Sequence, residues 1–341
     1  MTGTDFFCLP TVIGSMPHRD AKAACTLINR YLKDIPAWPQ LPRRSPLENM
    51  NVQYSEGFPG VVAEDGNLRV RRSPNLDKEL ERLYTAYLAG DYRRYPVSPE
   101  YAAGLYRFLD TRFSPRAVKG QVTGPVTWGL TTTDDSRRAI IYDEVLGEAL
   151  PKFLRLKAAW QESKLREICP RTIIFVDEPY LSSFGSVVVP LSRDKVISLL
   201  DEVLGGLSGL KGIHCCGNTD WSVVLATDID ILSFDAYGFA GSLSLYPGEV
   251  KRFLDKGGAI AWGIVPSREE DLLKESVASL KDRLEEAIAP FTRQGIPFRK
   301  LLEHSLLTLS CGLASLASEQ AAEEALATLA GLSEGLRKRY G

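Results

Sequence analysis

Apolar residues along the chain form eight short β-like runs, and a helical pattern follows most of them. The runs lie near residues 11–15, 50–55, 117–122, 172–177, 210–215, 229–235, 258–264 and 306–311. Such alternation is typical of a parallel sheet whose strands are joined by helices. It predicts an α/β fold, a (β/α)8 barrel of the TIM type.

The connection between the first and third runs is longer than a simple crossover. It contains a proline-rich stretch from Ile35 to Pro46, followed by residues 61–70, in which Asp65-Gly66 is a hairpin signal. We therefore expect an elaborated segment between the first and third strands. Glycine and proline are otherwise scattered and no internal repeat is present, so residues 1–341 are predicted to form a single domain.

One helix start is marked by a capping-box pattern. Ser267 stands three residues before Glu270, and the apolar residues that follow recur at helical spacing. The pattern predicts a helix that begins after Ser267 and packs its apolar stripe against the sheet.

The composition limits the classes of partner. The chain of 341 residues is 44% hydrophobic and 25% charged, with a net charge of −2 and no long basic tract, which argues against nucleic acid. Its start lacks a signal-peptide pattern and no apolar run could cross a bilayer, which predicts a cytoplasmic protein with no membrane partner. Six cysteines are too few for a dense disulfide framework, so reduced thiols are expected.

Polar residues gather at the carboxyl ends of the predicted strands. Each group alone could serve as turn chemistry, but the carboxyl ends of barrel strands meet at one mouth, where barrel enzymes hold their active sites. The groups are Gly14-Ser15, 121–127, Asp177-Glu178-Pro179, His214–Cys216, Ser233–Asp235 and Ser310-Cys311.

Three of these residues have the chemistry of a zinc site. His214 and Cys216 stand two residues apart, and Cys311 supplies a third soft ligand at the end of the last run. Three protein ligands leave a fourth position open, as in catalytic zinc sites, and two thiolates suit the metal to a thiol substrate. The alternative is that the cysteines are buried apolar residues.

Several of the strand-end motifs, taken in order, resemble the cobalamin-independent methionine synthases. That family belongs to a superfamily with the uroporphyrinogen decarboxylases and the methylcobamide:thiol methyltransferases. Pieces at 216–219 and 233–235 look closer to the methylcobamide:thiol branch. The matching motifs are Thr11-Val-Ile-Gly-Ser15, Thr123-Gly-Pro-Val-Thr127, Val176-Asp-Glu-Pro179, His214-x-Cys216 and Cys311-Gly-Leu313.

The resemblance implies a zinc enzyme that transfers a methyl group to a thiol, which in the methionine synthases is homocysteine. It places the carboxylate of homocysteine near Ile13 and Ser15 and the ammonium at Asp177. Glu56, in Tyr54-Ser-Glu-Gly, is the expected second carboxylate for that ammonium.

The sequence also departs from the family pattern. Asp235 stands where the synthases have a glutamate at the zinc, so it is expected either to reach the metal or to orient a ligand. The chain corresponds to the carboxyl-terminal half of the full-length synthases. Val265 replaces a histidine that protonates the departing folate, and His304 is a weak substitute.

These departures favour a methylcobamide donor carried by a corrinoid protein, because Co(I) leaves without a proton whereas a folate amine needs one. Three alternatives stay open. They are a coenzyme M-type or other thiol acceptor, methyltetrahydrofolate as donor, and a metal- or corrinoid-binding protein without turnover.

Overall fold

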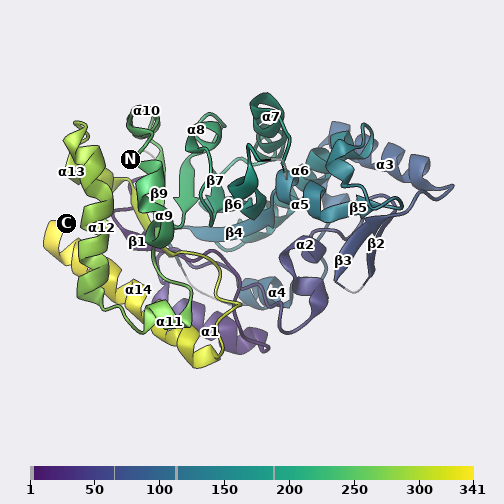
Figure 1. Cartoon of the computed structure of the whole chain (residues 1–341). Coiled ribbons are helices and arrows are strands. Elements are labelled where there is room, and N and C mark those ends of the chain that lie inside the picture. The colour runs from purple at the N-terminus through teal and green to yellow at the C-terminus, as the bar shows by residue number, and fades with distance from the viewer. Residues whose placement is uncertain (1–3, 65, 112–113, 187–188) are drawn as a thin grey trace.

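The computed structural model describes residues 4–64, 66–111, 114–186 and 189–341. Within this part of the chain, the protein has an α/β fold built on a curled sheet of seven parallel strands (Figure 1). In order of pairing, these are β1 (Leu9–Pro10), β10 (Ser305–Leu309), β9 (Ala259–Val265), β8 (Ile231–Phe234), β7 (Leu210–Cys215), β6 (Thr172–Asp177) and β4 (Val118–Thr123). The predicted parallel sheet is confirmed. Six predicted runs overlap β4 and β6 to β10, and the first lies just after β1.

The two edges of this sheet, β1 and β4, are bridged by the segment 34–40. Ala37 forms a parallel bridge with Lys119 on β4, and Gln40 forms another with Ser15, which follows β1. The Gln40 amide donates to the Gly14 carbonyl at 3.0 Å. Prolines at positions 36 and 39 have no N–H to donate, so the segment cannot form a continuous ladder.

The run at 50–55, expected to be the second strand, is helical instead. It holds α2 (Met50–Gln53), and the Asn49 side chain caps this short helix by accepting a hydrogen bond from the Asn51 amide. The strand prediction at this position is therefore wrong. The chain between the sheet edges comes from the preceding proline-rich stretch.

The long connection between β1 and β4 carries a small second sheet. An antiparallel hairpin is formed by β2 (Val61–Glu64) and β3 (Asn67–Val70), and β5 (Thr132–Asp134) pairs with β3 in parallel. The predicted elaboration and hairpin are confirmed, although Asp65 lies outside the described residues. The connection also holds α1 (Ala21–Tyr31), η1 (Pro46–Glu48), α3 (Leu76–Ala89), η2 (Tyr92–Arg94) and α4 (Ala103–Leu109).

Helices follow the remaining strands and pack around the sheet (Figure 1). Among the described helices, none is long and apolar enough to cross a membrane. The helices after β4 are α5 (Pro125–Thr131), η3 (Ile140–Tyr142), α6 (Leu146–Leu165), η4 (Pro179–Ser183), α7 (Arg193–Leu204), α8 (Trp221–Val224), α9 (Ala236–Leu243), α10 (Pro247–Asp255), α11 (Glu269–Leu272), α12 (Val277–Arg293), α13 (Phe298–Glu303) and α14 (Glu319–Tyr340).

The capping box predicted at Ser267 lies elsewhere. Ser267 is buried and its hydroxyl lies 3.0 Å from the Ser310 hydroxyl, while α11 has no side-chain cap. The capping box belongs to Ser276 and Ser279 at the start of α12, which carries most of the apolar stripe. The prediction of a capping box at Ser267 is therefore wrong. The Ser267 hydroxyl contacts the Ser310 hydroxyl instead and so links the segments that follow β9 and β10.

Two apolar clusters form the core. The smaller holds alternate residues of the strands, such as Ile173 and Phe175 on β6 and Ala259 and Ala261 on β9, and therefore fills the inner face of the curled sheet. The larger fills the space between the strands and the helices. At the carboxyl ends of the strands, buried polar residues replace these apolar side chains.

Candidate metal centre

A cavity of about 260 Å³ lies at the carboxyl ends of the strands. Six of the eight predicted site residues line it, and only Glu56 and Asp235 do not. The lining residues are Ile13, Ser15, Gln40, Pro42, Glu48, Asn49, Met50, Asp177, Pro179, His214, Cys216, Cys311, Gly312 and Ala314.

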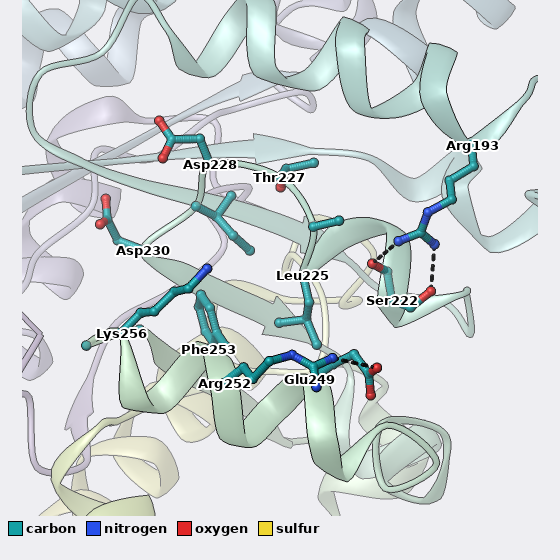
Figure 2. A pocket seen from close by; sticks show the side chains of 14 residues that line it. Arg193, Ser222, Leu225, Thr227, Asp228, Asp230, Glu249, Arg252, Phe253 and Lys256 are labelled. Atoms are coloured by element: carbon teal, nitrogen blue, oxygen red, sulfur yellow. Dashed lines mark hydrogen bonds and ion pairs between the residues drawn. The ribbon is translucent and has the colours of Figure 1, made fainter.

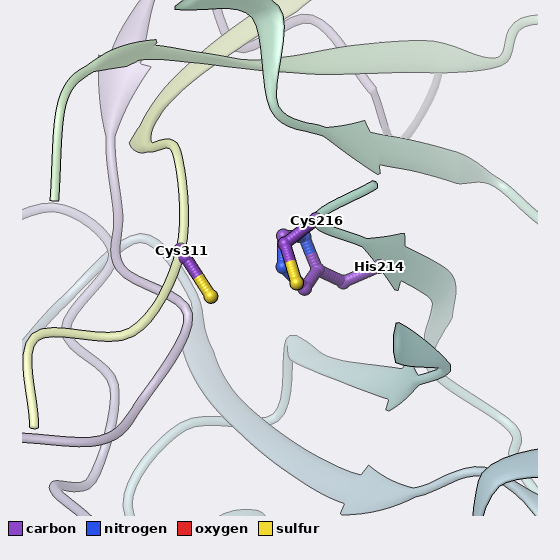
Figure 3. Close-up of side chains that lie close together, drawn as sticks. All are labelled: His214, Cys216 and Cys311. Atoms are coloured by element: carbon purple, nitrogen blue, oxygen red, sulfur yellow. The ribbon is translucent and has the colours of Figure 1, made fainter. Parts of the chain in front are cut away.

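His214, Cys216 and Cys311 meet in this cavity. Their ligand atoms, one imidazole nitrogen and two sulfurs, all lie within 4.8 Å of one another. His214 belongs to β7 and Cys216 follows it, whereas Cys311 follows β10 and points its sulfur toward them across the gap (Figure 3). Since β8 and β9 separate these strands in the sheet, the curl of the sheet brings the three residues together.

The hydrogen bonding of His214 leaves one ring nitrogen available to a metal ion. Nδ1 lies 3.0 Å from the hydroxyl of Ser233 on the neighbouring strand β8. Nε2 is buried and has no hydrogen-bond partner in the described part of the chain. Metal-bound histidines are typically held this way, with one nitrogen fixed by a neighbour and the other facing the ion.

The hydrogen bond between the two thiols shifts their pKa values in opposite directions. The pKa of the Cys311 thiol falls to about 4, because the Cys216 thiol donates a hydrogen bond to it and His214 lies beside it. The pKa of Cys216 rises, because it keeps the proton in that hydrogen bond and is partly buried. A divalent cation would take the place of this proton, so the donor set fits a soft metal ion.

Asp177 adds an unpaired carboxylate oxygen to the same cavity. The residue ends β6 and is 6% exposed, and its Oδ1 has no hydrogen-bond partner in the described structure. Burial raises its pKa to about 6, although His214 and Lys119 act in the opposite direction. A buried carboxylate without a partner is costly, so this oxygen is available to a ligand or an ordered water in the cavity.

The turn at Ile13–Ser15 lines the cavity and lies against the segment after β10, and each of the two segments requires a glycine. Gly14 has φ of 153°, and a Cβ there would lie 2.6 Å from the side chain of Gln121. A Cβ at Gly312 would lie 2.0 Å from the Ser15 hydroxyl oxygen. The two glycines thus allow Ser15 to lie against Gly312, the residue after Cys311.

Glu56 and Asp235 have partners outside the cavity. The Glu56 carboxylate accepts a hydrogen bond from the Ser98 amide at 2.8 Å. Asp235 caps α9 by accepting from the Gly238 amide at 2.7 Å. Burial raises the pKa of Asp235 to about 6, and the nearby Cys311 thiolate acts in the same direction.

Glu48 was missed by the sequence analysis and also lines the cavity. It is fully buried, forms a 2.8 Å ion pair with Arg44 and accepts from the Leu41 amide at 3.2 Å. Burial raises its pKa, and the hydrogen bond from Arg44 opposes that change. No motif marks Glu48 in the sequence, because its place depends on the fold of the proline-rich stretch.

No imidazole other than that of His214 lines the cavity in the described structure. His304 ends α13 just before β10, and its Nε2 lies 3.8 Å from Asp5, at the amino-terminal end of that strand. His18 is buried, with Nε2 3.8 Å from Glu319. Val265 is buried at the end of β9.

A second hollow, of about 620 Å³, lies on the outer surface and includes the loops that precede β8 and β9 (Figure 2). Its charged side chains are largely paired with one another or with nearby groups. Arg252 pairs with Glu249 at 2.9 Å, and Arg193 donates to the Ser222 hydroxyl at 2.7 Å. Because it contains none of the three residues that could hold a metal ion, we exclude it as the candidate site.

Comparison with known proteins found similarity to solved structures and to no family model or curated sequence. No family model matches the chain, and no curated protein matches its sequence. A B12-independent methionine synthase from Shewanella sp. W3-18-1, in complex with selenomethionine, superposes with a TM-score of 0.59 at 16% identity, over 97% of this chain and 98% of that one.

Two further structures are similar. A putative vitamin-B12 independent methionine synthase from Listeria monocytogenes gives a TM-score of 0.55 at 13% identity, over 92% of this chain and 85% of that one. A methyltransferase from Methanosarcina mazei gives 0.52 at 15% identity, over 91% and 82%. The structural neighbours are thus methionine synthase-like and methyltransferase structures, and at these identities they show a shared fold.

Proposed function

We propose that this protein is a zinc-dependent methyltransferase that converts homocysteine to methionine, with a methylcobamide on a corrinoid protein as donor. The observation that carries the proposal is the unpaired Nε2 of His214 beside the sulfurs of Cys216 and Cys311, in a cavity that also holds the unpaired Oδ1 of Asp177. The fold shared with methionine synthase and methyltransferase structures supports the same class of reaction.

The same proposal includes a closed eight-stranded barrel. The segment 34–40 would stand in for the second strand, since it bridges to the chain after β1 and to β4. Its role would then be to place Gln40 and the following Glu48 at the cavity.

The donor set favours zinc, because imidazole and thiolate are its preferred ligands and three protein ligands leave a position open for substrate. Bound zinc would lower the pKa of the acceptor thiol, so that a thiolate is present at neutral pH.

The cavity residues would bind and orient the acceptor. Asp177 would pair with its ammonium group, and Ser15 with the backbone at Ile13 would hold its carboxylate. Glu48, which lines the cavity, is a better second carboxylate for the ammonium than Glu56. Asp235 would act on the centre through its negative charge while it caps α9.

The proposed chemistry balances as a simple displacement. The thiol proton goes to solvent when the acceptor binds, and the thiolate sulfur then attacks the methyl carbon. The sulfur–carbon bond forms as the carbon–cobalt bond breaks, and both electrons of that bond stay on cobalt, which leaves as Co(I). No acid is needed for this leaving group.

Asp177→Asn should keep zinc but reduce kcat/KM for homocysteine about a hundredfold, from loss of a charge-assisted hydrogen bond of about 2–3 kcal/mol. The matched control is Glu56→Gln, whose carboxylate bonds the Ser98 amide outside the cavity and whose loss should leave kcat/KM near that of wild type. Metal content and methionine formation are measured on both variants. Equal kinetics in Asp177→Asn and wild type would reject the role of Asp177.

Ser233→Ala should weaken zinc binding about 10- to 100-fold, because the hydroxyl that orients the His214 ring is lost. Competition with a chromophoric chelator measures the affinity. Ser305→Ala is the control, since Ser305 is an equally buried serine that bonds Trp262 Nε1 at the other end of the barrel. If both variants hold zinc equally well, Ser233 has no part in the site.

A further inference from the structure

Lys119 is a buried cation directly behind the cavity wall. It lies on β4 with no exposed surface, and its Nζ donates to the Ile13 carbonyl at 2.7 Å and to the Gln121 side chain at 3.3 Å. The ammonium also stands over the Phe175 ring, 4.3 Å from its centroid. Burial lowers its pKa to about 8, and the charge of Asp177 opposes that change.

This lysine has no ion-pair partner within the described residues, which makes its burial costly. A buried charge that persists without a paired acid is more often used at a site than for stability.

The turn that Lys119 supports has an unusual pattern of backbone hydrogen bonds. The three carbonyls of Ile13, Gly14 and Ser15 accept from Lys119 Nζ, the Gln40 amide and the Leu313 amide, respectively. The three N–H groups of the same residues donate to no acceptor in the described part of the chain. With its carbonyls occupied and its N–H groups available, the turn has the character of an anion-binding segment.

Lys119 supplies positive charge behind the wall of a cavity that contains the unpaired carboxylate of Asp177. Among the described residues that line it are Asp177 and Glu48, with the two cysteines and without a lysine or an arginine. Glu48 is paired with Arg44, so the carboxylate of Asp177 is the unpaired negative charge that an anionic acceptor would meet. Lys119 is separated from the cavity by one backbone carbonyl, that of Ile13, and its positive charge acts on the same turn.

We propose that Lys119 determines the specificity of the cavity for a thiol that carries a carboxylate, by holding the Ile13–Ser15 turn and giving it positive charge. The inference rests on the proposed function, because it assumes that the cavity binds an acceptor thiol. Lys119 acts through the turn, so it is a positioning residue without direct contact to the substrate.

The test compares two acceptors on zinc-loaded protein: homocysteine and its decarboxylated analogue, which keeps the thiol and the amine. Calorimetry gives the affinity for each, and methyl transfer gives kcat/KM. In Lys119→Met, affinity for homocysteine should fall about 10- to 100-fold, while affinity for the analogue changes little. Zinc content should be unchanged, because Lys119 contacts no metal ligand in the described structure.

A second variant separates charge from hydrogen bonding. Lys119→Gln keeps a donor for the Ile13 carbonyl but has no charge, and it should lose the preference for homocysteine as Lys119→Met does. Full preference in Lys119→Gln, or equal losses for both acceptors in Lys119→Met, would overturn the inference alone. If neither thiol binds to the wild-type protein, the proposed function fails as well.

Discussion

Replacing Cys311 by serine is expected to remove zinc from the protein, and replacing Cys216 should do the same. Each change deletes one of the three ligand atoms that lie within 4.8 Å of one another. A serine hydroxyl is a poor ligand for zinc at neutral pH, since it stays protonated where a thiol does not. We expect the bound zinc to fall from one equivalent to near none after dialysis against a chelator, as measured by elemental analysis.

Cys215→Ser provides a closely matched control for this experiment. Cys215 neighbours Cys216 in sequence, but it is buried away from the cavity and its thiol donates to the Gly217 carbonyl at 3.6 Å. The variant should retain zinc. Full zinc in both Cys216→Ser and Cys311→Ser, or loss in Cys215→Ser alone, would show that the ion is bound elsewhere.

The order of strands and helices was readable from sequence because the strands are apolar on both faces and end in polar motifs. The prediction that the second run forms a strand was wrong for a local reason. Residues 50–55 are apolar enough for a strand, but Asn49 caps a helix there. The segment that bridges the edges of the sheet contains Pro36 and Pro39. Because proline is rare inside strands, the sequence of this segment does not resemble a strand.

The site was predictable where chemistry and position agreed, as for His214, Cys216, Cys311 and Asp177, which are brought together by adjacent or facing strand ends. The site was not predictable where the position of a side chain depends on the path of the chain in the folded structure. Glu48 reaches the cavity only through the path of the proline-rich connection, and Lys119 stands within an apolar run that gives no sign of a charge-bearing role. Glu56 was chosen by motif likeness, and the structure pairs it with Ser98.

The methyl donor is expected to be a methylcobamide, and the placement of the histidines supports this. A folate amine leaves only when protonated, and the loss of a general acid typically costs about 10²- to 10⁴-fold in rate. His304 lies at the opposite end of β10 from Cys311, and His18 does not line the cavity. Within the described residues, the imidazole that does line it is His214, whose free nitrogen is assigned to zinc.

Zinc-loaded protein with homocysteine should therefore demethylate methylcobalamin at least about a hundredfold faster than it uses methyltetrahydrofolate, because only the folate reaction needs the missing acid. Loss of the methyl–cobalt absorption and formation of methionine are followed together, with Cys215→Ser as the active control and Cys311→Ser as the inactive one.

Three other outcomes would contradict the proposal. Faster methylation of coenzyme M than of homocysteine would show that homocysteine is not the acceptor, and methylation of neither thiol would favour a binding protein without catalysis. Rapid methionine formation from methyltetrahydrofolate in the absence of any corrinoid would overturn the donor assignment. A proton would then have to reach the folate nitrogen from a group other than His304, because that side chain is bound to Thr4 and Asp5 at the far end of the strand.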